Sequence, residues 1–155
     1  MKRILLPLLA LALLLCACAQ PAAPTEHFAP ETVQQLLDCG AFSEPIDPLE
    51  ADIAWGLYRL SAAGLTREEM TQAVAYRSSG ATCEELALLT FRDAAAAQTA
   101  VTALESYLAD QILANRDYRP AQVPKLEQAQ LLCRGNTVLL VVANDYTPTA
   151  PLLNP

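Results

Sequence analysis

Two cysteines one residue apart, Cys16 and Cys18, are the most reactive feature near the start of the chain. They lie between an apolar run and a proline-rich stretch, in the sequence LLLCACAQPAAPTEH at residues 13–27. A thiol at such a place can be modified covalently, can form a disulfide or can bind a metal. The chain has no CxxC spacing, and its sole histidine, His27, lies in the proline-rich stretch, so a zinc site is disfavoured.

The start of the chain has the pattern of a secretory signal. Lys2 and Arg3 form a basic start, and residues 4–15 are a run of 12 apolar residues. A transmembrane helix needs about 20 residues to cross the apolar core of a bilayer, so this run is too short. No later stretch approaches that length, which predicts that the rest of the chain does not span a membrane.

The stretch Leu15-Cys16-Ala17-Cys18 resembles the signal of a bacterial lipoprotein. This pattern predicts a diacylglycerol thioether on Cys18 and cleavage of the chain before it. Cys16 fits that role poorly, because Leu15 is too large a residue to precede the modified cysteine. The alternative is an ordinary secretory signal cut near Ala19 or Ala23, which would discard both cysteines.

A diacylglycerol on Cys18 would hold the protein on a membrane. Each buried CH₂ group contributes about 0.8 kcal/mol, so one acyl chain binds marginally and two chains anchor stably. Residues 18–30 contain three prolines and no apolar periodicity, which predicts a flexible, extended tether. The sequence thus predicts a signal peptide over residues 1–17 and a location on the outer face of the cytoplasmic membrane.

The charge of the chain limits its partners. Removing residues 1–17 lowers the formal net charge from −7 to −9. An acidic chain is repelled by phosphate polymers and by anionic headgroups, so nucleic-acid binding is disfavoured. Membrane contact is therefore expected through the lipid and not through a basic surface.

Three further cysteines, Cys39, Cys83 and Cys133, lie in the predicted domain. Disulfides can form outside the cytosol, but an odd count leaves at least one thiol unpaired within the chain. Cys133 alternates with Leu131, as a residue that faces a core does in a strand. We expect reduced, partly buried thiols that serve packing, and a disulfide between Cys83 and Cys133 is the alternative.

Two short helices are expected at the start of the domain. The first spans residues 30–39, with a proline in its first turn and a glycine after its end. The second follows the sequence DPLE at 47–50, which resembles a capping box, and continues to about Arg59. Trp55 and Tyr58 lie on or beside this helix, where we expect them to pack in the core or at its rim.

The remainder of the domain predicts the order β-β-α-β-β. Residues 71–77 and 85–91 form one expected hairpin, and residues 125–133 and 137–143 form another around an Arg-Gly-Asn turn. Residues 93–115 between them form the clearest helix. The run VLLVV in the last strand is apolar on both faces, which indicates a strand at the centre of a sheet.

The long helix is expected to lie across the sheet. Asp93 can cap its start, and one face carries a stripe of apolar residues, while the opposite face is more polar. The predicted fold is therefore α+β, with one antiparallel sheet and a long helix packed across one face, in a single domain over residues 31–146. Residues 147–155 contain three prolines and are expected to form an irregular tail. The stripe consists of Ala97, Val101, Leu104, Leu108 and Ile112, and the opposite face of Gln98, Thr102, Glu105 and Ala109.

The chain resembles a family of lipoproteins of Gram-positive bacteria that carry domain of unknown function 4358. The family usually has a glycine after the tyrosine that corresponds to Tyr58, whereas this chain has Arg59 at a predicted turn. The resemblance implies an extracytoplasmic domain on a lipid anchor in the cell envelope, and it implies no activity. It covers about residues 31–145 and rests on LYRLSAAGL (57–65), YRSSGATCEELALLTFRD (76–93), YRPAQVPKLEQA (118–129) and GNTVLLVVAND (135–145).

The sequence contains no recognisable catalytic constellation. Ser78-Ser79-Gly80 lacks the first glycine of a GxSxG elbow, and the predicted domain has no histidine to pair with a serine or cysteine. The pairs Glu68-Glu69 and Glu84-Glu85 point apart, so they are poor acid–base partners, and we expect them on solvated faces. Asp93, Asp110 and Asp117 lack calcium-loop spacing, and no metal or cofactor is expected.

A candidate contact surface consists of residues in turns or at strand ends: Tyr76, Arg77, Tyr118, Arg119 and Asn136. Tyrosine and arginine dominate the energetics of interfaces, although Tyr118 would alternatively pack its ring on the end of the long helix. We expect a membrane-anchored, non-enzymatic binding or accessory module with an envelope protein or glycan as its partner. The alternative is an enzyme or enzyme subunit that acts on envelope glycans or their acyl groups.

Overall fold

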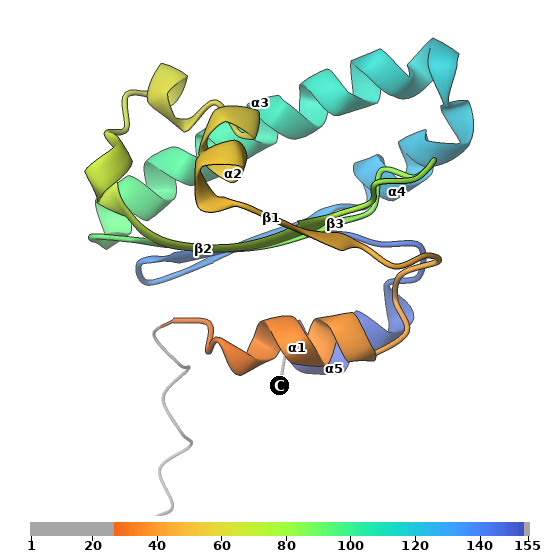
Figure 1. Cartoon of the computed structure of the whole chain (residues 1–155), viewed down its shortest axis with the longest axis horizontal. Helices are drawn as coiled ribbons and strands as arrows, with labels where there is room; N and C mark the ends of the chain where they lie inside the picture. The colour runs from red at the N-terminus through yellow and green to blue at the C-terminus, as the bar shows by residue number, and fades with distance from the viewer. Residues whose placement is uncertain (1–26, 154–155) are drawn as a thin grey trace, which may run out of the picture.

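The structure is a computed structural model that describes residues 27–153. The predicted signal peptide, most of the predicted tether and Cys18 lie outside these residues. The described part forms one five-stranded antiparallel sheet with helices on both faces (Figure 1). Within it, no helix combines the length and the apolar character needed to cross a bilayer.

The strands lie in the order β1-β2-β3-β5-β4, and each neighbouring pair is antiparallel. β3 and β5 lie at the centre and are almost wholly buried, which confirms the prediction made from the VLLVV run. The strands are β1 (Asp47–Leu49), β2 (Met70–Arg77), β3 (Glu85–Phe91), β4 (Gln130–Arg134) and β5 (Thr137–Val142).

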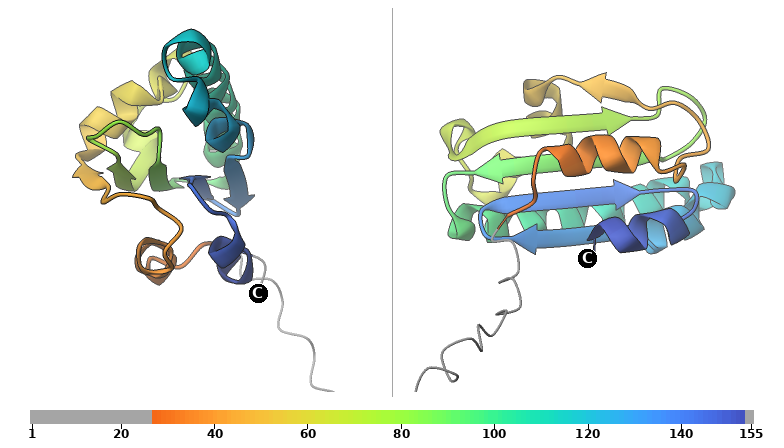
Figure 2. Two further views of the ribbon diagram at one scale, coloured as in Figure 1. Left: turned by 90° about the vertical axis from the view of Figure 1, so that its right-hand side faces the viewer. Right: turned by 90° about the horizontal axis from the view of Figure 1, so that it is seen from below.

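The helices divide between the two faces of the sheet. One face carries α2 (Ala51–Leu57), α3 (Ala94–Tyr118) and α4 (Val123–Glu127), and the other carries α1 (Glu31–Asp38) and α5 (Ala150–Leu153) (Figures 1 and 2). Each layer encloses its own apolar cluster against the sheet. The predicted α+β fold is confirmed. Short 3-10 turns join these elements at η1 (Leu60–Ala63), η2 (Arg67–Glu69), η3 (Pro120–Gln122) and η4 (Thr147–Thr149).

The long helix α3 packs across the sheet as predicted, but it presents a shifted face. Its start is capped by Asp93, whose side chain accepts a hydrogen bond from the Ala96 N–H at 2.9 Å. Leu104 is fully buried, whereas Leu108 is only half-buried at the margin of the core. Alanines predominate among the buried residues of α3, which are Ala96, Ala97, Ala100, Ala103, Leu104, Tyr107 and Asn115.

The segment before α2 differs from the prediction. Asp47 does not cap a helix but lies in β1, where it pairs with Arg77 at the edge of the sheet. Pro48 suits an edge strand because its missing N–H removes no bond from the interior of the sheet. The helix therefore begins at Ala51 with Glu50 in the N-cap position, and the sheet gains a fifth strand.

The domain extends beyond its predicted limits at both ends. Phe28, in the predicted tether, is buried, and its N–H donates to Thr137 Oγ1 at 2.9 Å. The predicted irregular tail forms η4 and α5, because Leu153 is buried against the α1 layer and its carbonyl accepts a hydrogen bond from Arg134. The strand predicted to begin at 125 instead begins at Gln130, after the short helix α4.

The three cysteines of the described part are free. Cys83 is buried and Cys39 is half-buried, in agreement with a packing role. The prediction that Cys133 faces the core was wrong, since this residue is exposed. The reason is that β4 is the outermost strand, and Cys133 lies beside its hairpin turn, with Sγ 3.8 Å from the Gly135 carbonyl oxygen.

Candidate functional site

Two adjacent carboxylates at the start of β3 lie in the interior of the protein. Glu84 and Glu85 are both buried, so the prediction that they lie on a solvated face was wrong. They do point apart as predicted, and each reaches partners from elements on opposite sides of the strand. In the other predicted pair, by contrast, Glu68 is exposed and Glu69 is half-buried.

Glu85 accepts hydrogen bonds from two tyrosines of the α3 layer. Tyr58 donates to Oε1 at 2.5 Å and Tyr107 donates to Oε2 at 2.7 Å. The two rings meet edge to face with their centroids 5.2 Å apart. The Arg77 side chain approaches from the strand end, with Nε 3.8 Å from Glu85 Oε2. This cluster fixes the end of α2 and the middle of α3 to the centre of the sheet.

The burial of this cluster changes the acidity of its members. Burial raises the pKa of the Glu85 carboxyl, although the tyrosine hydroxyls and Arg77 favour its charged form. Burial and the nearby Glu85 charge raise the pKa of Tyr58 and of Tyr107. Both tyrosines therefore remain protonated hydrogen-bond donors near neutral pH.

The raised pKa of Glu85 predicts how stability changes with pH. Between the unfolded pKa of about 4.3 and the higher folded pKa, the folded chain binds more protons than the unfolded chain. The contribution of Glu85 to the free energy of unfolding therefore falls as the pH rises through this window, whereas glutamine at this position contributes no such slope. We expect the free energy of unfolding of the wild type to exceed that of Glu85→Gln by a growing amount as the pH is lowered from neutral toward about 4.5.

Urea unfolding of both chains at a series of pH values measures this difference. Glu44, Glu69 and Asp145 have pKa values lowered by hydrogen bonds, so their contributions fall on acidification. Those contributions are common to both chains and are removed by the subtraction. A difference that shrinks as the pH falls would contradict the expectation.

Glu84 connects α4 to the loop that follows α1, on the opposite face of the sheet. It accepts hydrogen bonds from the Ser43 hydroxyl, from the Ser43 N–H at 2.7 Å and from Lys125 Nζ at 2.6 Å. The Lys125 side chain is only 16% exposed, so this ion pair is largely desolvated. Glu84 thereby ties the loop after α1 and the helix α4 to the start of β3.

The turn between β2 and β3 surrounds another carboxylate. Glu44 accepts hydrogen bonds from the Ser78 hydroxyl and, at 2.8 Å, from the Thr82 hydroxyl. A Cβ atom at Gly80 would lie 2.8 Å from Glu44 Oε2, so a larger residue here would displace the Glu44 carboxylate from its present position. The SSGAT sequence thus binds a carboxylate of the same chain and closes one end of the domain.

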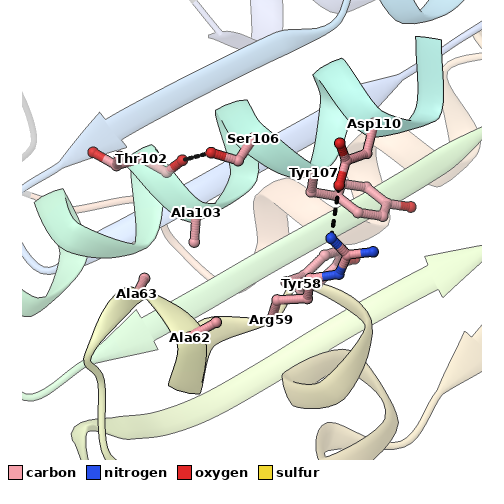
Figure 3. Close-up of a pocket in the computed structure, with 9 residues that line it drawn as sticks. All are labelled: Tyr58, Arg59, Ala62, Ala63, Thr102, Ala103, Ser106, Tyr107 and Asp110. Atoms are coloured by element: carbon pink, nitrogen blue, oxygen red, sulfur yellow. Dashed lines mark hydrogen bonds and ion pairs between the residues drawn. The ribbon is translucent and has the colours of Figure 1, made fainter. Parts of the chain in front are cut away.

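A pocket of about 280 Å³ opens beside the Tyr58–Tyr107 pair, between α3 and η1 (Figure 3). The Ala103 methyl points from α3 toward the methyls of Ala62 and Ala63 on η1 (Figure 3). Ser106 donates a hydrogen bond to the Thr102 carbonyl within α3, so its hydroxyl is partly engaged. The full lining consists of Tyr58, Arg59, Ala62, Ala63, Thr102, Ala103, Ser106, Tyr107 and Asp110.

Arg59 and Asp110 face each other at this pocket. Arg59 Nη1 lies 2.7 Å from Asp110 Oδ2, and their side chains are 69% and 50% exposed. Arg59 has φ 51° and ψ 38°, a left-handed conformation that costs a residue other than glycine about 1–2 kcal/mol. An exposed ion pair contributes only about 0.2–1 kcal/mol, so the ion pair alone does not offset the strained backbone.

The predicted contact residues do not form one surface. Arg77 and Arg119 both contact the last turns of α3, through Gln111 at 3.5 Å and Asn115 at 2.8 Å respectively. Asn136 lies at the opposite end of the sheet, where its amide donates to the Phe91 carbonyl at 2.8 Å. Tyr76 packs against the α1 layer, on the other face from the pocket.

Tyr118 is the most exposed of these residues, at 83%, so its ring does not pack on the end of the helix. The helix α3 continues through Tyr118, three residues beyond its predicted end, before Pro120 begins η3. Arg119 caps this end by donating to the Asn115 side chain and, at 3.2 Å, to the Ala81 carbonyl. Of the five predicted contact residues, the neighbouring Arg77 and Arg119 and the exposed Tyr118 therefore remain candidates for a contact surface.

Sequence reasoning missed the residues that surround the pocket. The signal available was the spacing of Thr102, Ser106 and Asp110, which places three polar residues on one edge of α3. Ala62 and Ala63 on η1, which line the pocket opposite these residues, follow a turn at Arg59. Only the fold brings them close to α3. Across the described residues, no group of three or more acidic, histidine or cysteine side chains is arranged to hold a metal ion.

Comparison with known proteins places the chain in one family. The family model described as "Domain of unknown function (DUF4358)" matches residues 62–143, from η1 to the residue after β5. The match includes α3 and all of the central strands, and it begins inside the η1 wall of the pocket. No curated protein and no solved structure matches the chain.

Proposed function

This chain belongs to the DUF4358 family, and we propose that it is a membrane-anchored extracytoplasmic lipoprotein that acts as a non-enzymatic binding module. The proposed anchor is a diacylglycerol on Cys18, and the proposed partner is a component of the cell envelope. The proposed binding site is the pocket between α3 and η1. The observation that carries the binding role is the convergence of an exposed ion pair and a small apolar floor at that pocket.

The location rests on the first residues of the chain. The basic start, the short apolar run and the Leu15-Cys16-Ala17-Cys18 stretch support lipid attachment at Cys18. The first described residue, His27, is nine residues after Cys18, so the two can be at most about 30 Å apart. A folded domain on such a tether would remain close to the outer surface of the membrane.

A binding role also agrees with the state of the buried carboxylates. Both oxygens of Glu85 accept tyrosine hydroxyls, and both oxygens of Glu84 accept donors from Ser43, with Lys125 as an additional donor. These bonds join three layers of the fold, so the carboxylates already have a structural task. A general acid or base must instead reach the reacting atom of a substrate within hydrogen-bond distance.

One arrangement favours the alternative of an enzyme that acts on envelope glycans or their acyl groups. The hydroxyl of Ser43 donates to Glu84, which also pairs with Lys125, so a serine lies beside a carboxylate and an amine. This arrangement is the weaker candidate, because Lys125 is already engaged with Glu84, and the Glu84 side chain is fully buried and out of reach of a substrate. Loss of an envelope-modifying activity in Ser43→Ala, with unchanged stability, would favour the alternative.

Cell fractionation tests the proposed anchor. We expect Cys18→Ser to leave the membrane fraction, because the thioether that would hold the diacylglycerol cannot form. Cys16→Ser is the matched control and is expected to stay in the detergent phase, since Leu15 makes Cys16 a poor site of modification. A Cys18→Ser protein that still partitions into detergent would refute the lipoprotein proposal.

Site-specific crosslinking in cells tests the binding role. A small diazirine-bearing residue in place of Ser106 is expected to yield a defined adduct upon irradiation, because Ser106 lines the pocket. The same residue in place of Gln98, exposed on α3 outside the pocket lining, serves as the control. The adduct should disappear when Ala103→Leu fills the pocket, and equal labelling at both positions would contradict the proposal.

A further inference from the structure

We propose that the pocket between α3 and η1 binds a free α-amino acid with a short aliphatic side chain, held by Arg59 through its carboxylate and by Asp110 through its ammonium group. This inference rests on the proposed binding function and assigns its ligand class. Four features of the pocket carry it: the spare hydrogen-bonding capacity of the ion pair, the backbone of Arg59, the apolar floor and the small volume.

The ion pair retains hydrogen-bonding capacity on both sides. Within the described residues, Arg59 donates a single hydrogen bond, from Nη1 to Asp110 Oδ2, although a guanidinium carries five N–H groups. Asp110 Oδ1 likewise accepts no bond there, and both side chains remain at least half exposed. A ligand can therefore add bonds to both groups.

A zwitterion satisfies this pair better than a single charge does. A lone anion bound to Arg59 would lie next to the Asp110 carboxylate and be repelled by it, and a lone cation bound to Asp110 would meet Arg59 in the same way. An α-amino acid carries its ammonium and carboxylate groups on one carbon, so both charges can meet their partners at once. The carboxylate also matches the planar fork of the guanidinium.

The backbone of Arg59 indicates that its side chain serves more than stability. Its left-handed conformation favours glycine, and the exposed ion pair with Asp110 does not offset that preference. Strained residues of this kind concentrate at binding and catalytic sites. The conformation aims the guanidinium across the pocket at Asp110 on α3 (Figure 3).

The floor of the pocket is suited to a short aliphatic group. The methyl of Ala103 on α3 and the methyls of Ala62 and Ala63 on η1 line opposite walls of it (Figure 3). Tyr107 and Tyr58 turn their hydroxyls away toward Glu85, so their rings contribute the apolar part of the wall. The volume of about 280 Å³ lies just below the range of about 300–1,000 Å³ that is typical of sites for drug-sized ligands.

Calorimetric titration of the full chain, purified in detergent, with alanine and valine tests this assignment. Both enantiomers are used, together with valinamide, N-acetylvaline and ethanolamine phosphate. The first two analogues lack the free carboxylate or the ammonium group, and the third is a zwitterion without an aliphatic side chain. We expect at least one amino acid to bind and each analogue to bind at least tenfold more weakly.

Variants connect the binding to the pocket. Arg59→Gly and Asp110→Asn are expected to weaken binding at least tenfold, and Ala103→Leu is expected to abolish it. Arg59→Gly also suits the left-handed backbone, so its loss of binding would not result from unfolding. Arg67→Gln is the matched control, because Arg67 forms a similar exposed ion pair with Asp52 at 2.9 Å outside the pocket lining. Its affinity should stay within twofold of wild type.

The outcomes separate this inference from the proposed function. If no amino acid binds while the crosslink at Ser106 persists, the ligand class is wrong and the binding role stands. If both are lost, the binding role is wrong as well. Binding that survives Ala103→Leu, or ethanolamine phosphate that binds as tightly as valine, would also overturn the assignment.

Discussion

Replacing Glu84 by alanine is expected to lower the free energy of unfolding by about 3–5 kcal/mol, the usual effect of removing one partner of a buried ion pair. The variant leaves Lys125, whose side chain is 16% exposed, without its counter-charge. It also removes the acceptor for the hydroxyl and N–H of Ser43. Such a loss is a large part of the total stability of about 5–15 kcal/mol that is typical of a domain.

A double-variant cycle with Lys125 tests the cause of this loss. Lys125→Met alone leaves the Glu84 carboxylate buried without its cation, so it should also be strongly destabilising. The double variant Glu84→Ala with Lys125→Met removes both charges and is expected to be much less destabilised than the sum of the two single losses. Urea unfolding of the four chains measures the coupling.

Glu127→Ala is the matched control for this cycle. Glu127 lies on α4, as Lys125 does, but it is exposed. Its replacement is expected to change the free energy of unfolding by no more than about 0.5 kcal/mol. Additive losses in the double variant would show that the ion pair does not contribute as described.

The burial of Glu84 and Glu85 illustrates what the sequence alone does not reveal. Charged residues are rarely buried unless they are paired, so an adjacent pair of glutamates is expected on the surface. Their hydrogen-bond partners lie 22 to 41 residues away along the chain, on elements whose packing sets the contact. The sequence feature that could have indicated this burial was the apolar run ELALLTF. A strand that is buried on both faces carries its first residues into the core as well.

Local patterns predicted the central elements well and the edges poorly. The periodicity of residues 93–115 and the turns of both hairpins correspond to α3 and to the pairs β2–β3 and β5–β4. The DPLE stretch at 47–50 has the pattern of a helix cap, yet pairing with β2 outweighs that local preference. The family resemblance was confirmed over residues 62–143, whereas its implied lipid anchor stays a prediction.

The backbone at Arg59 is the left-handed conformation that glycine favours. The family resemblance implied a glycine after the tyrosine that corresponds to Tyr58, at a position that precedes the matched residues 62–143. The arginine of this chain therefore occupies a conformation that suits glycine better. A sequence comparison alone indicates a turn here, but only the fold brings this arginine next to Asp110 on α3.

Leu104→Ala is expected to cost the folded domain about 2–5 kcal/mol, because it removes a large side chain from a fully buried position. Leu104 belongs to the apolar cluster between α3 and the sheet, whose neighbours cannot fully collapse into the cavity. Leu108→Ala is expected to cost less than half as much, since Leu108 is half-buried at the margin of that cluster. Urea unfolding of the two variants measures both losses.

Thr102→Ala and Glu105→Ala are the matched controls on the exposed side of α3, and each is expected to change the free energy of unfolding by no more than about 0.5 kcal/mol. The relative sizes of the losses in the free energy of unfolding identify the face of α3 that packs on the sheet. The apolar stripe in the sequence places Leu104 and Leu108 on one face, which would predict similar losses at both. The structure instead buries Leu104 together with Ala100, Ala103 and Tyr107. Equal losses at Leu104 and Leu108 would therefore contradict the packing described for α3, and large losses at the controls would contradict the position of the helix itself.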